Sequence, residues 1–551
     1  MVRLYCALAL ALLTGAAAAQ ESDPAAVNAK LATPLPADQA AMKAHVLFLA
    51  SDAMKGREAG SPEFDIAAQY VAAQFYAAGL RPGGDAGGYL QQVPLVTYRL
   101  DGEGSAVWTL PGGRAYAFVP GDQFAASANP AHAATRVSAP VVFVGWGMDA
   151  RQLGHDDYKG IDARGKIVAV VAGAPAGLGG EERAFFQSAA TKAQTAARHG
   201  AVGMVIVSTR PAAPTPAGGT SRPPARQSTG RMTWANPDGT GRADAVGTPV
   251  LGTLTTTGAA QLFGADWAKI TAAAASEAPR WPTLKPKGTL TVESRTSFTA
   301  GASSNVIGTV PGSDPKLKGE VVVLSAHLDH IGTRATGEGD RINNGALDNA
   351  IGIASLIEEA KRFTASGQPP KRTLMFLAVT GEEKGLVGSD YFASHPTVPL
   401  KSIVADVNLD MPILTYRFED MIVYGADRTT LGPIVAHAVE SVGVTMSPDP
   451  APEQGIFVRS DHFRFVQKGV PAVFLWPGQK GPGKAAFEAF MGRCYHRPCD
   501  ELAQQPILWD QGVRFVDVNY RIAREVADAP LRPVWNRGDY FATLYGGVVG
   551  G

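Results

Sequence analysis

Strand-length apolar runs alternate with amphipathic segments through the C-terminal half of the chain. The apolar runs are 320–325, 373–379, 402–409 and 470–475. The segments with helical spacing of apolar positions are 349–363 and 430–442. Strands that are apolar on both faces are typical of parallel sheets covered by helices on each side. The pattern therefore predicts an α/β fold, with a mostly parallel mixed sheet sandwiched by helices.

The N-terminal half shows two other patterns of apolar and polar positions. Helical spacing runs through 38–80, whereas 89–120 alternates and contains many Gly and Pro residues, which is typical of strands and turns. Residues 139–208 hold three short apolar runs and an Ala-rich helical segment at 187–199. This stretch predicts a separate, smaller domain, and the Pro, Gly, Ser and Thr residues of 211–240 predict an exposed loop.

The first residues have the order of an export signal. Arg3 is followed by an apolar run from Leu4 to Leu13, and Ala17, Ala18 and Ala19 precede Gln20. The run is shorter than the roughly 20 residues of a membrane span, so it predicts a cleaved signal peptide at 1–19, followed by a lead-in at 20–37. We expect a periplasmic or secreted protein without a transmembrane segment.

Composition narrows the choice of partners. The 551 residues include 50 Lys+Arg and 50 Asp+Glu, and 45% of residues are hydrophobic. The chain is long enough for two or three packed domains and too apolar for a disordered protein. A balanced charge gives no reason to expect nucleic acid as a partner.

Two cysteines remain after the predicted cleavage, Cys494 and Cys499, on either side of His496. An oxidising compartment would allow them to form a disulfide that pins the loop of His496. A pair of zinc thiolates is the alternative, but four intervening residues and the lack of a second pair disfavour it.

Polar residues gather just after the predicted core strands. The motifs are His327-Leu328-Asp329-His330, Leu347-Asp348-Asn349, Gly381-Glu382-Glu383, Asn408-Leu409-Asp410 and Tyr495-His496. Carboxyl ends of parallel strands are where ligands bind in such sheets. Carboxylates held together would repel one another unless cations neutralise them, and imidazole with carboxylate suits zinc. The set could hold a single zinc with three ligands, or two metals that share a carboxylate.

In this order, the five motifs resemble those of the two-zinc aminopeptidases, which include aminopeptidase Y, aminopeptidase S and the bacterial leucyl aminopeptidases. That family is related to glutamate carboxypeptidase II, the transferrin receptor and glutaminyl cyclase. The resemblance covers most of residues 40–530, and the motifs are specific together although each alone is weak.

The resemblance implies a role for each site residue. His327 and Asp410 would bind one zinc, Glu383 and His496 the other, and Asp348 would bridge the two. Asp329 would orient His327 from behind. Glu382 would be the general base that takes a proton from the attacking water.

The implied activity is that of a metallo-exopeptidase with two zinc ions per chain. Its substrates would be the N-termini of peptides or proteins. A glutaminyl-peptide cyclase or a carboxypeptidase on the same fold is the alternative, and a binding module without catalysis is disfavoured because all five ligands are present.

The stretch from 139 to 285 resembles the protease-associated domain, a β-rich α/β insertion that in related proteins covers or shapes the active-site cleft. The match lies in Tyr158 to Val168, Lys192 to Gly203, and Pro249-Val250. This implies a discontinuous catalytic domain, 38–137 with 288–535, around an insertion at 138–287. Residues 536–551 would form a C-terminal tail.

Two further polar features could be taken for part of the site. Ser460-Asp461-His462 resembles part of a catalytic triad but lacks a Gly-x-Ser-x-Gly elbow, so we expect it to support the site. His330 directly follows Asp329, and we expect it to pack behind the ligands.

Overall fold

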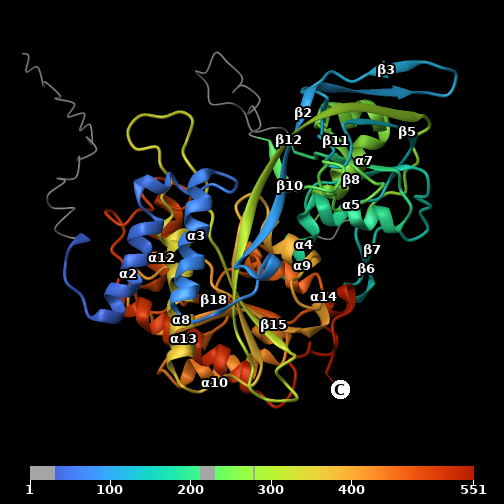
Figure 1. The fold of residues 1–551 in the computed structure, drawn as a ribbon. Helices are drawn as coiled ribbons and strands as arrows, with labels where there is room; N and C mark the ends of the chain where they lie inside the picture. Colours follow the sequence, from blue (N-terminus) through green and yellow to red (C-terminus); the bar gives the residue numbers. More distant parts are fainter. Residues whose placement is uncertain (1–30, 211–229, 277–279, 551) are drawn as a thin grey trace, which may run out of the picture.

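The computed structural model describes residues 31–210, 230–276 and 280–550 (Figure 1). The predicted signal peptide, most of the predicted lead-in and residues 211–229 of the predicted loop lie outside these ranges. Within them, none of the helices has the length and apolar character needed to cross a bilayer.

The larger part of the molecule, here the main domain, is built on one sheet. From one edge inward its strands are β17 (Thr445–Ser447), β16 (Asp420–Tyr424), β18 (Ala472–Pro477), β15 (Ile403–Asn408), β13 (Val321–His327), β14 (Thr373–Val379) and β12 (Thr289–Val310). The central strands β14, β13, β15 and β18 are parallel neighbours. Strands β12 and β16 pair with them in the antiparallel sense. The predicted mostly parallel mixed sheet is confirmed.

Helices cover both faces of this sheet. One face carries α2 (Ala37–Leu49), α3 (Pro62–Ala77), α8 (Ile351–Ala365), α10 (Leu431–Glu440) and α13 (Trp509–Asp528), and the other α9 (Val387–Ser394) and α11 (His462–Val466). Successive residues of β13 point to opposite faces: Val322 and Leu324 join the first core, whereas Val321 and Val323 join the second. The apolar run 320–325 is therefore buried on both sides, as its sequence predicts.

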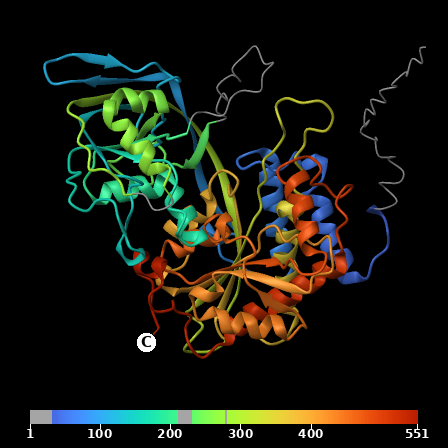
Figure 2. The same cartoon turned by 180° about the vertical axis from the view of Figure 1, so that it is seen from behind.

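The inserted domain has its own sheet and core. Strands β5 (Ala134–Phe143), β8 (Ile167–Val171), β9 (Gly203–Val207) and β11 (Val250–Leu254) are parallel, and helices α5 (Ala189–Arg198), α6 (Thr256–Phe263) and α7 (Trp267–Ala274) pack on them. Figures 1 and 2 show this domain beside the upper end of the main sheet, from the front and from behind.

Two long strands belong to both domains. Strand β2 (Leu90–Thr109) pairs with β12 along its whole length, from Leu90 with Val306 to Thr109 with Thr289. Near the main domain Val93 and Leu95 pack against Val387, whereas Ala106 and Trp108 at the far end lie in the core of the inserted domain. The domains are thus joined by a paired ladder, and their limits at 137–138 and 287–288 stay a prediction.

Part of the predicted loop 211–240 is a strand, so that prediction is wrong for residues 231–234. Strand β10 (Arg231–Trp234) pairs with β2, and Met232 and Trp234 pack beside Val387. The indole nitrogen of Trp234 donates to Asp390 Oδ2 at 2.7 Å. These two apolar side chains explain why the segment pairs with the sheet in spite of its polar neighbours.

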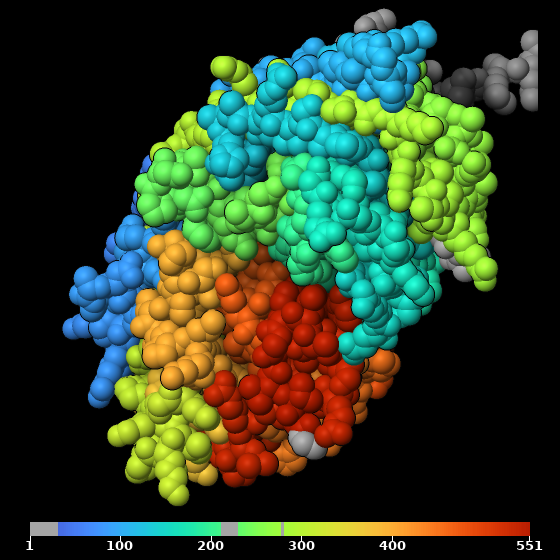
Figure 3. Space-filling model, turned by 90° about the vertical axis from the view of Figure 1, so that its right-hand side faces the viewer, coloured from blue at the N-terminus to red at the C-terminus, as the bar shows by residue number. Residues whose placement is uncertain are grey.

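The predicted C-terminal tail is packed between the domains. Helix α14 (Tyr540–Tyr545) places Phe541 against Phe185 of α4 (Gly180–Gln187), with ring centroids 5.4 Å apart. Arg428 of the main domain bonds Glu182 of α4 at 2.7 Å and Asp539 at 2.8 Å. Figure 3 shows the C-terminal segment, in red, directly against the blue-green inserted domain.

Candidate metal centre

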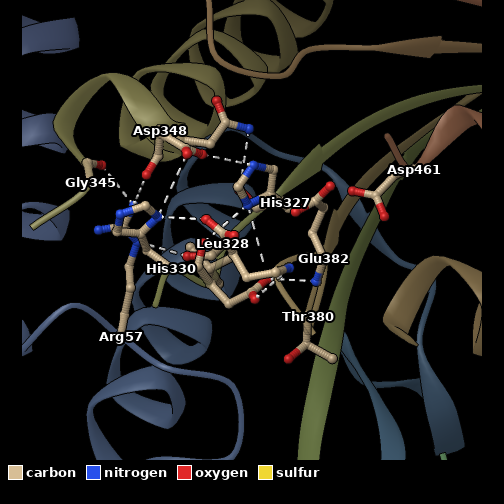
Figure 4. Close-up of polar contacts among 12 residues, drawn as sticks. Arg57, His327, Leu328, His330, Gly345, Asp348, Thr380, Glu382 and Asp461 are labelled. Atoms are coloured by element: carbon tan, nitrogen blue, oxygen red, sulfur yellow. Dashed lines mark hydrogen bonds and ion pairs between the residues drawn. The ribbon is translucent and has the colours of Figure 1, made fainter. Parts of the chain in front are cut away.

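The carboxyl ends of three parallel strands bring the predicted site residues together. His327 ends β13, Glu382 and Glu383 follow β14, and Asp410 follows β15. Strand register aligns these ends, because His327 pairs with Val379 and Ser325 with Asn408. Figure 4 shows Asp348 between His327 and His330, with Glu382 on the side of His327.

One group of ligand atoms surrounds His327. Its Nε2 lies 3.0 Å from Asp410 Oδ1 and 3.3 Å from Asp348 Oδ1. His327 is 1% exposed, and Asp348 and Asp410 are also buried. The three atoms lie close enough to one another to share a single cation.

A second group uses the other oxygen of Asp348. His496 Nε2 lies 3.3 Å from Asp348 Oδ2 and 3.1 Å from Glu383 Oε2. His330, which was expected only to pack behind the ligands, directly contacts Glu383 Oε1 through Nδ1 at 2.8 Å, and its Nδ1 is 3.8 Å from Asp348 Oδ2. The Asp348 carboxylate thus lies between the two groups, with one oxygen facing each.

The loop that carries Asp348 is held from below by two residues that the sequence did not single out for this role. Asp500 accepts the backbone N–H groups of Leu347 and Asp348 at 2.9 and 3.0 Å. Buried Arg57 donates to the carbonyls of Leu328 and Gly345 at 2.7 and 2.8 Å. The hydrogen bonds of Asp500 and Arg57 thus fix the loop from two sides.

Gly345 has to be glycine at the start of this loop. Its φ is 63°, and a Cβ atom there would lie 2.2 Å from the carbonyl oxygen of Asp348. The following Asp348–Asn349 peptide is cis. Helix α8 begins at Ile351, two residues later than predicted, because residues 346–350 form an irregular turn that presents Asp348.

Asp329 acts through different atoms from those expected. Its carboxylate lies 4.0 Å from His327 Nδ1, too far for a hydrogen bond, and its backbone oxygen lies 3.0 Å from that nitrogen. The carboxylate instead accepts the backbone N–H groups of Glu382 and Glu383 at 3.1 and 3.3 Å. Asp329 therefore positions the Glu pair with its side chain and His327 with its main chain.

The Ser460-Asp461-His462 motif supports the site and does not form a triad. Ser460 donates to Asp410 Oδ2 at 2.6 Å and accepts from Asn408 Nδ2 at 2.7 Å. Asp461 accepts from Ser389, and the ring nitrogens of His462 have no hydrogen-bond partner among the described residues. Burial lowers the pKa of His462 to about 3, so its ring is neutral.

The charges of the site depend on one another. Burial opposes every charge, but the neighbouring histidines outweigh it and lower the pKa of Glu383 to about 2 and that of Asp348 well below its usual range. The carboxylates likewise outweigh burial and raise the pKa of His496 to about 10. For Glu382 burial dominates, and its pKa is raised well above the ordinary value. A shielded carboxylic acid that can exchange a proton suits general acid–base chemistry.

The spacing of the donor atoms fits zinc. Ligand atoms that share a tetrahedral zinc at ~2.0–2.1 Å lie about 3.3 Å from one another. The four contacts of His327 and His496 with carboxylate oxygens, at 3.0 to 3.3 Å, are close to this value. The contacts of His330, at 2.8 and 3.8 Å, deviate further. Glu383 Oε1 is shielded from solvent and faces His330 Nδ1 at 2.8 Å.

The loop of His496 is fixed by a disulfide. The structure joins Cys494 and Cys499, five residues apart, directly after α12 (Gly483–Arg493). Tyr495 stacks on the His496 ring with centroids 3.9 Å apart. The disulfide, and not a thiolate pair, is what the structure forms here.

A cavity opens onto the ligand groups from solvent. Glu382 lines it together with His327, Asp348, Asp410 and His496. Its remaining walls are mostly apolar or aromatic: Met411, Ile456, Phe474, Trp476, Met491 and Tyr495, with Arg459 and Ser460. A ligand here would place one end among the acidic groups and an apolar part against these walls.

Comparison with known proteins assigns both domains. Residues 305–521 match peptidase family M28, and residues 137–260 match the PA domain. Leupeptin-inactivating enzyme 1 of Streptomyces exfoliatus is 31% identical over 229 residues, which cover 39% of this chain and 46% of that protein. Probable leucine aminopeptidase 2 of Aspergillus oryzae is 29% identical over 199 residues, covering 34% and 35%. The chain thus spans less than half the length of these relatives.

Solved structures with a similar outline include the aminopeptidase from Aneurinibacillus sp. strain AM-1. The TM-score is 0.47 at 21% identity, and the alignment covers 91% of this chain and 97% of that one. The two domain matches do not overlap, and the PA match lies wholly ahead of the M28 match. The chain therefore contains an M28 peptidase domain over residues 305–521 and a PA domain over residues 137–260.

Proposed function

We propose that the protein is an exported zinc aminopeptidase that removes the N-terminal residue of peptides. The observation that carries the proposal is the Asp348 carboxylate, whose two oxygens face two groups of histidine and carboxylate ligands at zinc spacing. The names of the two relatives, an enzyme that inactivates a peptide inhibitor and a probable leucine aminopeptidase, support the choice of activity.

His327 and Asp410 would hold one zinc, Glu383 and His496 the other, and Asp348 both. Bound zinc supplies a water that is acidic near neutral pH and polarises a scissile carbonyl. His330, in contact with Glu383, keeps that carboxylate turned toward His496.

Glu382 is the residue that moves the proton. It lines the same cavity as the ligands, where its carboxylate would take a proton from the attacking water and pass it to the leaving amine. Backbone contacts with Asp329 fix the Glu382–Glu383 pair, so that one side chain faces the cavity while the other contacts His496.

The acidic groups and the apolar walls of the cavity define the substrate end that fits. A protonated N-terminal amine is attracted by the carboxylates, and the walls of Ile456, Phe474 and Met491 suit an apolar first side chain. Apart from the histidines of the ligand groups, Arg459 is the single basic residue lining the cavity among the described residues. This lining supports an aminopeptidase over a carboxypeptidase for acidic C-termini, which needs several cations.

The test measures zinc content and hydrolysis together on the mature protein. We expect two zinc ions per chain, faster release from leucyl than from lysyl or glutamyl anilides, and inhibition by 1,10-phenanthroline. Glu382→Gln, which keeps the size of the side chain, should retain zinc and lose ~10²–10⁴-fold in kcat. Hydrolysis that survives chelation would refute the proposal. One zinc with turnover only of N-terminal glutamine peptides would favour the cyclase.

A further inference from the structure

Three cavities lie outside the metal centre, one at the inserted domain and two between it and the main domain. The first is lined mainly by the inserted domain, the second by β10 together with residues 383–390, and the third by α4, α5 and the segment 454–467. Asp244 lines all three, so they meet at this residue. The first and second also share Tyr98, Pro130 and Arg231.

This system of cavities, here called the interdomain cleft, reaches the metal centre by two arms. Glu383, a candidate ligand, lines the second cavity. Arg459 lines both the third cavity and the cavity that contains Glu382. A chain that leaves the metal centre by either arm arrives at Asp244.

The far end of the cleft is largely apolar. The first cavity has a volume of about 250 Å³, just below the usual range of small-ligand sites. Small or apolar side chains form much of its wall: Ala131, Ala189, Ala190, Ala193, Ile206, Ala245, Pro249 and Val250. Small residues leave space that a Leu- or Phe-sized side chain would fill.

The neck of the cleft is polar. Arg231 is exposed there, and its side chain contacts the Tyr98 hydroxyl but forms no ion pair with a carboxylate among the described residues. The other cations of the neck are paired with carboxylates: Arg242 lies 3.0 Å from Asp390, Arg464 lies 3.9 Å from it, and Lys384 bonds Glu58. A guanidinium has five N–H donors, so Arg231 keeps donors for a carbonyl or carboxylate of a ligand.

We propose that the interdomain cleft binds the downstream residues of an extended peptide whose N-terminus lies at the metal centre. An apolar side chain of that peptide enters the first cavity, and Arg231 holds a main-chain oxygen at the neck. This inference rests on the proposed aminopeptidase function. It assigns the inserted domain a specificity role through named side chains.

The experiment compares short and long substrates in matched variants. In the wild type, kcat/KM for oligopeptides that begin with Leu should rise about tenfold or more when one downstream Gly is replaced by Leu. Leucyl anilide, which does not reach the cleft, is the reference. Ala245→Trp fills the first cavity and should abolish this positional preference while it changes anilide hydrolysis less than about twofold. Ala133→Trp, an exposed position on a neighbouring loop outside the cavities, should keep the preference.

A second variant covers the case in which Ala245→Trp does not fold. Arg231→Gln should lower kcat/KM for the oligopeptides several-fold and leave the anilide unchanged. The inference is overturned if no downstream position matters, or if the preference survives both changes while the anilide is cleaved. If the wild type cleaves neither substrate, the proposed function itself fails and the inference falls with it.

Discussion

At the residue scale, a single hydroxyl sets the orientation of one candidate ligand. Ser460 donates to Asp410 Oδ2 and so leaves Oδ1 facing His327. We predict that Ser460→Ala weakens zinc binding about 10–100-fold without unfolding the protein, because residues behind a ligand have effects of this size. Competition with a chromogenic chelator measures the affinity. Ser389→Ala, which removes an equally buried hydroxyl from the non-ligand Asp461, is the matched control and should bind zinc normally.

The two histidines near Glu383 can be distinguished by metal counting. We predict that His496→Ala lowers the zinc content from two ions to one per chain, because its contacts have ligand spacing. His330→Gln should keep two ions and lower activity, because it removes only the contact that steadies Glu383. Elemental analysis after dialysis gives the stoichiometry. Retention of both ions in His496→Ala with loss of one in His330→Gln would reverse the assignment.

Much of this site could be predicted from the sequence because the residue types that bind metals directly follow the predicted strands. His327, Asp348, Glu383, Asp410 and His496 come together in space, as the motif order predicts. A sequence motif names a residue and not its atoms. It therefore could not show that Asp329 positions His327 with its main chain and the Glu pair with its side chain. It also could not show that Asp500 accepts two backbone N–H groups, because hydrogen bonds between distant loops leave no spacing signal.

At the scale of elements, helix α8 carries a buried acid that the proposed chemistry does not use. Glu359 is fully buried, neither of its oxygens has a hydrogen-bond partner among the described residues, and burial raises its pKa to about 8. The folded state therefore holds a proton on Glu359 that the unfolded chain releases near its ordinary pKa of 4.5.

The sign of the resulting pH dependence follows from proton linkage. Between about pH 4.5 and pH 8 the folded state binds more protons than the unfolded state at this residue, so its contribution to stability falls as the pH rises. We predict that Glu359→Gln flattens this decline and raises the thermal midpoint at pH 8 more than at pH 5. Scanning calorimetry at both values tests it. Equal shifts at the two values would show that Glu359 is not the titrating group.

The elements that could not be predicted from the sequence are those that depend on tertiary contacts. The core strands were predictable because burial on both faces leaves uninterrupted apolar runs. Strand β10 was not, since its pairing with β2 rests on Met232 and Trp234 within a polar stretch. The start of α8 was displaced because residues 346–350 bend to present Asp348 and so lose the helical pattern there.

At the scale of the whole molecule, one arginine holds three segments together. Arg428 contacts Glu181 and Glu182 of the inserted domain and Asp539 ahead of α14, and its guanidinium lies over the rings of Phe457 and Phe541. Burial raises the pKa of Glu181 to about 7 even beside this cation, so the cluster is largely shielded from water.

We predict that Arg428→Met destabilises the protein by about 3–5 kcal/mol, because it leaves three carboxyl groups without their cation. Helix α4 should also become more sensitive to limited proteolysis. Arg521→Met is the control: its partner Asp517 lies one turn away on the surface of α13, and such pairs contribute only about 0.3–0.5 kcal/mol. Urea titration followed by fluorescence compares the two, and similar losses would contradict a clamping role.

The paired strands β2 and β12 also set how this molecule can discriminate among substrates. Their ladder runs from one domain into the other with a single register shift, between Glu293 and Arg295, so paired backbone limits how far the two domains can move relative to each other. An opening of nearly constant width admits or rejects a chain by its cross-section. The protein would then select substrates by their width. It would accept frayed or unfolded N-terminal segments and exclude those held within a folded domain, whatever their first residue.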